Sequence, residues 1–202
     1  YAAALYAHNF GLSVALVERD KVGGTCLHRG CVPAKTWLQT ASVFSQVAGA
    51  AEFGEQASEP TLDWTKALER KVGIVDKHHT GLAGLLRKRG DDVLEGTGRL
   101  DRPGGVSVSG SDGTSQTVEA RNVIVATGST PRTIPGYDID GDRIVTSDHA
   151  LDWPSQPDRV AVIGAGAIGA EFAPLLADLG SEVHLFEVAE QILPGIDHAA
   201  AK

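Results

Sequence analysis

The two cysteines of the chain, Cys26 and Cys31, are separated by only four residues. A disulfide between them would close a very small ring, which restricts few unfolded conformations and therefore adds little stability. Such a bond is better suited to opening and closing than to holding a fold together. The alternatives are a structural disulfide, half of a zinc site or two inert buried thiols. A secreted disulfide scaffold normally contains more cysteines, and zinc needs further thiolate or imidazole ligands at defined spacing. We therefore favour a redox pair.

The residues that follow the pair predict a helix that begins near Cys31. Pro33 fits the first turn of a helix, because its missing N–H is one that the helix start leaves unpaired. Apolar residues then recur at helical spacing, at Ala34, Trp37, Leu38, Ala41 and Phe44. Cys31 would therefore lie near a helix N-terminus, with Arg29 and Lys35 close by. This setting favours the thiolate form of a cysteine.

A second motif lies near the end of the chain, in residues 164–169, which read Gly-Ala-Gly-Ala-Ile-Gly. The pattern follows a predicted strand at 159–163 and opens a predicted helix that Gly180 would end. The next strand, at 182–187, ends in Glu187, eighteen residues after Gly169. This order is the dinucleotide-binding fingerprint, in which the helix N-terminus holds the pyrophosphate. Glu187 would accept hydrogen bonds from a ribose 2′-hydroxyl and repel a 2′-phosphate, which favours NAD over NADP.

The start of the chain resembles the second half of another dinucleotide-binding unit. Residues 1–10 predict a helix capped by Gly11, and residues 13–18 predict a buried strand that ends in Glu18. A carboxylate at this strand end binds ribose hydroxyls in such units. The alternative is a solvated glutamate. The first strand and its glycine-rich turn would precede Tyr1, so the chain is expected to be cut at both ends.

The middle of the chain predicts a loop, a long helix and several strands. Residues 49–61 predict a loop, and apolar residues step by three or four along a helix at 64–89, which Gly90 ends. A short strand at 93–95 and a β-meander at 99–121 follow. The adjacent His78 and His79 point in different directions on a helix, so no metal site is predicted.

Residues 122–129 predict a buried strand that delivers Ala-Thr-Gly at its carboxyl end. A proline- and glycine-rich connection follows at 131–157, with a strand at 143–145 and a domain boundary near 151–154. Pro174 lies inside the predicted last helix, where it removes one hydrogen bond and should kink or weaken it.

Composition restricts the classes of function. The net charge of −8 argues against nucleic-acid binding, which normally uses a basic patch. No apolar run approaches the roughly 20 residues of a membrane span, and no signal peptide is visible. Two cysteines suited to exchange fit a reducing compartment, so a cytoplasmic location is predicted.

The segment Gly23–Lys35, which reads GGTCLHRGCVPAK, resembles the active-site segment of the flavoprotein disulfide reductases, and among them most closely that of the dihydrolipoamide dehydrogenases. The resemblance implies that Cys26 exchanges with a dithiol substrate and that Cys31 lies against the flavin. It places Lys35 at the reactive edge of the flavin. Glu171 matches a glutamate that pairs with this lysine near the nicotinamide.

The resemblance also implies two sets of cofactor-binding residues. The residues expected to bind FAD are Glu18, Gly23, Gly24, Thr25, Lys35, Gly98, Ala126, Thr127, Gly128 and Ser129. Those expected to bind NAD are Gly164, Gly166, Ala167, Ile168, Gly169, Glu171 and Glu187.

Taken together, these features predict an α/β chain with two Rossmann-like parts. Residues 1–150 would form an FAD-binding domain with a small β-meander insertion, and residues 151–202 the first βαβ unit of an NAD-binding domain. The resemblance implies that the intact parent is a homodimer that oxidises dihydrolipoamide with NAD and serves the lipoyl domain of a 2-oxo acid dehydrogenase complex. No residue matches the His–Glu acid–base pair of that family. The alternatives are a mercuric or glutathione reductase, both of which usually use NADPH, and an inactive nucleotide-binding fragment.

Overall fold

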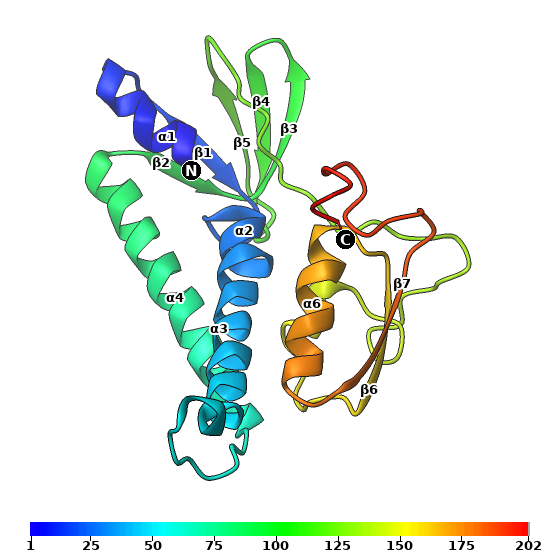
Figure 1. Ribbon diagram of the computed structural model, residues 1–202. Coiled ribbons are helices and arrows are strands. Elements are labelled where there is room, and N and C mark those ends of the chain that lie inside the picture. Colours follow the sequence, from blue (N-terminus) through cyan, green and yellow to red (C-terminus); the bar gives the residue numbers. More distant parts are fainter. Residues whose placement is uncertain (202) are drawn as a thin grey trace. The chain divides into compact units, whose positions relative to one another are not determined.

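The computed structural model describes residues 1–201, which form two compact units. The first unit combines Tyr1–His28 with Val75–Thr130, and the second combines Arg29–Ile74 with the chain from Pro131 onward. Both units mix helices and strands, as the sequence predicts (Figure 1). The helix α4 (Trp64–Arg89) contributes to both units, and its bounds match the predicted 64–89.

The first unit begins with helix α1 (Ala2–Ala7) and a 3₁₀ turn, η1 (His8–Phe10). Gly11 ends this turn in the left-handed conformation, with a φ of 66°. Strand β1 (Ala15–Glu18) then pairs in parallel with β2 (Asp92–Glu95), so that Glu18 lies opposite Glu95. The predicted helix and both predicted strands are therefore present, although β1 is half-buried rather than buried.

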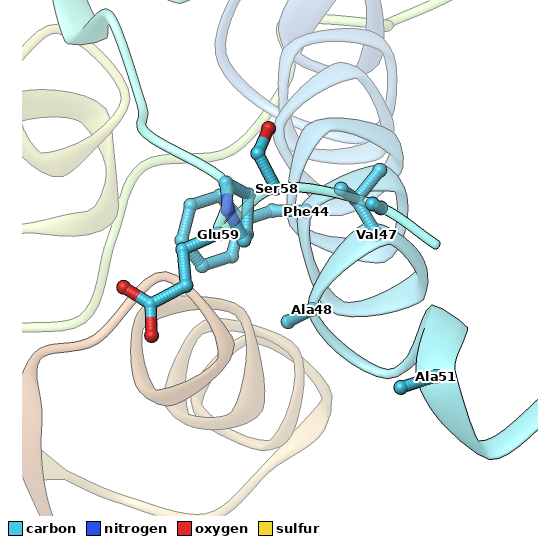
Figure 2. Close-up of a pocket in the computed structure, with 8 residues that line it drawn as sticks. Phe44, Val47, Ala48, Ala51, Ser58 and Glu59 are labelled. Atoms are coloured by element: carbon cyan, nitrogen blue, oxygen red, sulfur yellow. The ribbon is translucent and has the colours of Figure 1, made fainter. Parts of the chain in front are cut away.

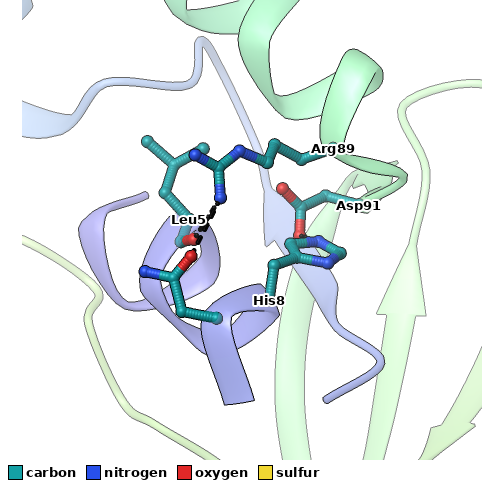
Figure 3. A network of polar contacts seen from close by, with 5 residues as sticks. Leu5, His8, Arg89 and Asp91 are labelled. Atoms are coloured by element: carbon teal, nitrogen blue, oxygen red, sulfur yellow. Dashed lines mark hydrogen bonds and ion pairs between the residues drawn. The ribbon is translucent and has the colours of Figure 1, made fainter. Parts of the chain in front are cut away.

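A small apolar cluster and a polar network hold these elements together. The cluster centres on Ala4, Val22 and Leu86, which are buried. In the network, which Figure 3 shows, the ring of His8 hydrogen-bonds to the Asp91 carboxylate at 2.8 Å. Arg89 donates to the Leu5 carbonyl and to a side-chain oxygen of Asn9. These contacts join the end of α1 to the turn between α4 and β2.

The predicted β-meander is confirmed as an antiparallel sheet of three strands, in the order β3 (Thr97–Arg102), β4 (Gly105–Ser109) and β5 (Ser115–Glu119). Figure 1 shows it as a separate group of strands beyond the β1–β2 pair. Val108 on β4 is the buried centre of this sheet, with 1% of its surface exposed.

The second unit contains helix α3 (Cys31–Ala48), the 3₁₀ turn η2 (Ala50–Phe53), the first part of α4 and a short helix α5 (Ser147–Ala150). A βαβ unit follows, with β6 (Arg159–Ile163), α6 (Ala167–Asp178) and β7 (Glu182–Phe186). Strands β6 and β7 pair in parallel, as the fingerprint requires. Helix α6 continues through Pro174 to Asp178, so the proline does not end it.

Two tryptophans fix the connection that leads into the βαβ unit. The ring centroids of Trp37 on α3 and Trp64 on α4 lie 4.4 Å apart, and Trp37 is buried. Each indole N–H donates to a backbone carbonyl of the connection, Trp37 to Leu151 at 3.1 Å and Trp64 to Trp153 at 2.8 Å. The buried Lys71 adds an ion pair with Asp152. The segment 151–153 is thus tied to both helices.

The prediction of a buried strand at 122–129 is wrong. These residues are irregular and exposed, with 72% of the surface accessible at both Ile124 and Val125. An apolar run forms a strand only when a neighbouring strand takes up its backbone hydrogen bonds. The described residues contain no such partner beside this segment.

The prediction of a strand at 143–145 is also wrong. The carboxylate of Asp140 accepts hydrogen bonds from the backbone N–H groups of Asp142, Arg143 and Ile144, each at 2.9 Å. This folds the segment into a turn, because an aspartate side chain can replace the partners of a strand.

Candidate active site

Cys26 and Cys31 form a disulfide. Both are disulfide-bonded, and the chain has no other cysteine. Cys26 lies on the short helix α2 (Gly24–Arg29), and Cys31 is the first residue of α3. Both residues are exposed. The ring therefore encloses most of α2 and ends at the start of a long helix.

The start of α3 gives Cys31 the environment that the sequence predicts. Pro33 is buried in the first turn, and Thr36 donates to the Val32 carbonyl at 2.9 Å. Once the disulfide opens, the unpaired N–H groups at this N-terminus would stabilise the Cys31 thiolate. The residue one turn further, Lys35, is exposed and forms an ion pair with Glu171 on α6. The predicted pairing of these two residues is thus present in the second unit.

A shallow pocket of about 330 Å³ lies beside Cys31 in the second unit. Its lining includes Lys35, Gln39 and Arg70, and Arg70 donates to the Thr36 carbonyl at 3.4 Å. A second pocket of similar volume lies between the end of α3 and residues 57–60, as Figure 2 shows around Phe44 and Glu59. None of the predicted site residues lines this second pocket, so it is not the redox site.

The glycines before Cys26 adopt conformations that other residues rarely reach. Gly23 has a φ of 131° and Gly24 a φ of 71°. Gly23 is also tightly enclosed, because a Cβ atom there would lie 2.9 Å from the Nε2 atom of His28. Thr25 turns toward the predicted Ala-Thr-Gly segment and donates to the Ser129 carbonyl at 3.4 Å. Its hydroxyl lies against Gly128, which has a φ of 81°.

Two further predicted FAD residues of the first unit, Glu18 and Gly98, lie near the end of β1. Glu18 ends this strand, and one of its carboxylate oxygens accepts the backbone N–H of Asp20 at 3.0 Å. Gly98 on the neighbouring β3 approaches β1 closely, because a Cβ atom there would lie 3.1 Å from the side chain of Val17. Glu18 and Gly98 therefore lie in one region of the first unit. Thr25 and Gly128 contact each other at a second place in the same unit. Ala126 and Thr127 lie in the exposed segment before Gly128.

The glycine-rich turn after β6 is closely packed. Gly164 has a φ of 101°, and a side chain at Gly169 would collide with the Gly164 carbonyl oxygen. Gly166 caps α6, whose first two residues are Ala167 and Ile168, and a Cβ atom at Gly166 would meet open space. The turn therefore has room for a ligand at Gly166 and none at Gly169.

Glu187 closes this turn from the end of β7. Its carboxylate accepts backbone N–H groups from Ala189 at 2.9 Å, Ala165 at 2.7 Å and Val188 at 2.8 Å. These bonds, that from Ala189 first, hold the pKa of the Glu187 carboxyl below its ordinary value of 4.5. Glu187 therefore remains an anion near neutral pH.

Residues 1–201 contain neither a cluster of His, Cys, Asp or Glu side chains that could hold a metal ion nor a membrane-spanning helix. Among residues 1–201, no group of three or more His, Cys, Asp or Glu side chains is placed to hold a metal ion. Across the same residues, the helices are too short or too polar to span a bilayer.

Comparisons with known proteins agree with this geometry. The family model described as pyridine nucleotide-disulphide oxidoreductase matches residues 1–202. The chain is 39% identical over 210 residues to a dihydrolipoyl dehydrogenase of Bacillus subtilis, and the alignment covers 100% of this chain and 44% of that protein. It is 40% identical over 205 residues to dihydrolipoyl dehydrogenase 3 of Pseudomonas putida, and that alignment also covers 100% of this chain and 44% of the relative.

The fold matches a solved structure over almost the whole chain. LpdA from Mycobacterium tuberculosis superposes with a TM-score of 0.87 at 27% identity, covering 99% of this chain and 44% of that one. The chain thus spans less than half the length of these three proteins.

Proposed function

Because the chain belongs to the pyridine nucleotide-disulphide oxidoreductase family, we propose that it carries the redox centre of an FAD-dependent enzyme that oxidises dihydrolipoamide with NAD. The observation that carries this proposal is the exposed Cys26–Cys31 disulfide at the start of α3. A small, exposed disulfide beside a helix N-terminus is suited to exchange. The names of the relatives from Bacillus subtilis and Pseudomonas putida support the choice of substrate.

The exchange balances within the two cysteines and the substrate. One substrate thiolate attacks the sulfur of Cys26, the Cys26–Cys31 bond breaks, and Cys31 leaves as a thiolate. The second substrate thiolate then attacks the substrate sulfur of the mixed disulfide and releases Cys26. The substrate leaves as a cyclic disulfide, and the protein has gained two electrons. The N-terminus of α3 stabilises the Cys31 thiolate during the first step.

The residues of the first unit fit a flavin nucleotide. Glu18 offers its second carboxylate oxygen to ribose hydroxyls, and Gly24, where a Cβ atom would meet open space, leaves the backbone before Cys26 accessible. Gly23 and Gly98 instead allow close packing within the protein on either side of this region. FAD, when bound, accepts the two electrons of the dithiol and passes them to NAD. Thr25 and the segment 126–129 would contact this group, and Lys35, in its ion pair with Glu171, would lie at its reactive edge.

The residues of the βαβ unit fit NAD. Gly164 and Gly166, where a Cβ atom would meet open space, leave the backbone at the start of α6 accessible to a pyrophosphate, and Gly169 lets α6 pack closely against the Gly164 carbonyl. Ala167 and Ile168 would supply N–H groups there. Glu187 is an anion whose charge would repel the 2′-phosphate of NADP. This favours NAD and counts against a mercuric or glutathione reductase. We further propose that the protein is homodimeric and cytoplasmic and that its partner is a lipoyl domain of a 2-oxo acid dehydrogenase complex.

The test is the reaction of the purified chain with dihydrolipoamide under anaerobic conditions, with FAD added. We expect two free thiols to appear and a long-wavelength thiolate–flavin absorption band to develop. Cys26→Ser should show that band before any reductant is added, because Cys31 is then free, and Cys31→Ser should never show it. A disulfide that a phosphine reduces but dihydrolipoamide leaves intact would contradict the proposed substrate. Thiols without the band would leave the exchange in place and show that this chain does not retain flavin.

A further inference from the structure

Two histidines of the first unit share one backbone carbonyl next to the redox pair. The Nε2 atom of His28 lies 2.9 Å from the carbonyl oxygen of Val22, and the Nδ1 atom of His79 lies 3.1 Å from the same oxygen. Their ring centroids are 5.3 Å apart, with the rings edge to face. His28 lies on α2 between the two cysteines, and His79 lies on α4, 57 positions beyond Val22.

The chemistry of the carbonyl fixes the proton positions on both rings. A carbonyl oxygen only accepts hydrogen bonds, and its two lone pairs can take two donors. His28 must therefore carry a hydrogen on Nε2, and His79 must carry one on Nδ1. Each ring donates from a different nitrogen, which distinguishes the two histidines in a mutational test.

Helix α2 depends on such side-chain contacts for its position. It has six residues, and so short a helix has little stability of its own. Leu27 is buried, Thr25 donates to the Ser129 carbonyl, and His28 donates to the Val22 carbonyl. The enclosure of Gly23 against His28 shows that this last contact is closely packed. Cys26 is thus held by neighbours on both sides along α2.

We propose that His28 and His79 are positioning residues that hold Cys26 in place while the disulfide is open. This inference rests on the proposed function, in which the disulfide opens in every cycle. The closed ring restricts Cys26 covalently, and this restriction ends on reduction. The contacts to Val22 contain neither sulfur atom, so opening the disulfide does not itself break them, but they must then order α2 without the help of the closed ring. They keep the Cys26 thiol at a high effective concentration for closing the bond again.

Equilibration of the full chain with glutathione measures the effective concentration of the Cys26 thiol for closing the disulfide. Two glutathione thiols give two electrons and two protons to the Cys26–Cys31 bond and become one glutathione disulfide. The fraction of reduced chain at known glutathione ratios yields the effective concentration of one cysteine thiol for the other. A residue that merely stabilised the fold would stabilise both forms alike and leave this equilibrium unmoved.

We expect His28→Leu and His79→Leu each to lower the effective concentration about twofold to tenfold, as the loss of all or part of one hydrogen bond implies. Amide variants supply the rescue. A glutamine nitrogen reaches the place of Nε2 and an asparagine nitrogen that of Nδ1, so His28→Gln and His79→Asn should stay near the wild-type value. The matched control is His78→Leu, because His78 is exposed on the adjacent position of α4.

The outcomes separate this inference from the proposed function. A wild-type disulfide that never exchanges with glutathione would overturn both. A wild-type chain that exchanges, with equal equilibria in His28→Leu and His28→Gln, would overturn the positioning role alone. If the leucine variants do not fold, His28→Gln and His28→Asn decide the question. Equal values for these two amides would contradict the inference, and a lower value for the asparagine would support it.

Discussion

Lys35 on α3 and Glu171 on α6 lie 136 positions apart in the sequence, and their side chains form an ion pair in the second unit. Both side chains keep much of their surface in solvent, 59% for Lys35 and 40% for Glu171. Solvent screens an exposed ion pair, so its worth to the fold is small. The pair is therefore expected to contribute little to stability, and the role proposed for it is at the cofactor.

The first prediction concerns this pair. A double-mutant cycle with Lys35→Met and Glu171→Gln should give a coupling of roughly 0–1 kcal/mol in the free energy of unfolding. Urea denaturation of the four proteins measures it. If the pair acts at the flavin, either substitution should still change the absorption spectrum of bound FAD. A coupling well above that range, with an unchanged flavin spectrum, would make the pair a structural feature.

The second prediction concerns the glycine-rich turn. Gly169→Ala should destabilise the second unit and abolish NAD binding, because the new methyl group collides with the Gly164 carbonyl. Overpacking of this kind typically costs about 1–3 kcal/mol. Gly166→Ala is the matched control, since its methyl group meets open space. It should leave the unfolding free energy nearly unchanged and weaken only NAD binding, as measured by calorimetry. Equal destabilisation by both variants would contradict the packing argument.

The third prediction concerns how much Glu187 contributes to the free energy of unfolding at low pH. Its folded-state pKa lies below its ordinary value of 4.5 because backbone N–H groups, that of Ala189 first, bind the carboxylate. A depressed pKa contributes stability that is fully present above the unfolded-state pKa and is lost as pH falls through the folded-state pKa. The stability difference between wild type and Glu187→Gln should thus be constant near neutral pH and shrink below about pH 4.5. Unfolding curves between about pH 3 and pH 7 test this, and a difference independent of pH would contradict it.

The fourth prediction concerns the anchor of the segment 151–153. Trp37→Phe removes the donor to the Leu151 carbonyl at a buried site and should lower the free energy of unfolding by about 1–3 kcal/mol. Trp153→Phe is the control, because Trp153 contributes its backbone carbonyl to the contact with Trp64. Thermal denaturation of both variants gives the comparison. A larger loss at Trp153 than at Trp37 would show that ring packing, rather than the hydrogen bond, fixes the segment.

Strong local patterns made much of the fold predictable. The apolar period along 64–89 gave the bounds of α4, and the alternation in 99–121 gave the β-meander. The fingerprint at 164–169 gave the parallel pairing of β6 and β7, because its spacing is itself the geometry of a βαβ unit. The position of Cys31 at the start of a helix followed from Pro33 and the apolar spacing after it.

Features that depend on distant partners were not predictable. The apolar residues 122–129 carry a strand pattern, yet a pattern does not supply the neighbouring strand that would pair with it. Helix α2 is too short to show a period, and the shared carbonyl of Val22 joins residues far apart in the chain. The buried Lys71 showed no signal either, because its ion pair with Asp152 crosses 81 positions.

The closely spaced, tilted rings of Trp37 and Trp64 have an optical consequence. Two indoles 4.4 Å apart are coupled chromophores, so their transitions should split and produce a paired signal in the near- and far-ultraviolet circular dichroism spectrum. Loss of either ring, or separation of α3 from the first turn of α4, should remove that signal. The second unit therefore contains an intrinsic spectroscopic label, and its assembly can be followed without attaching a dye.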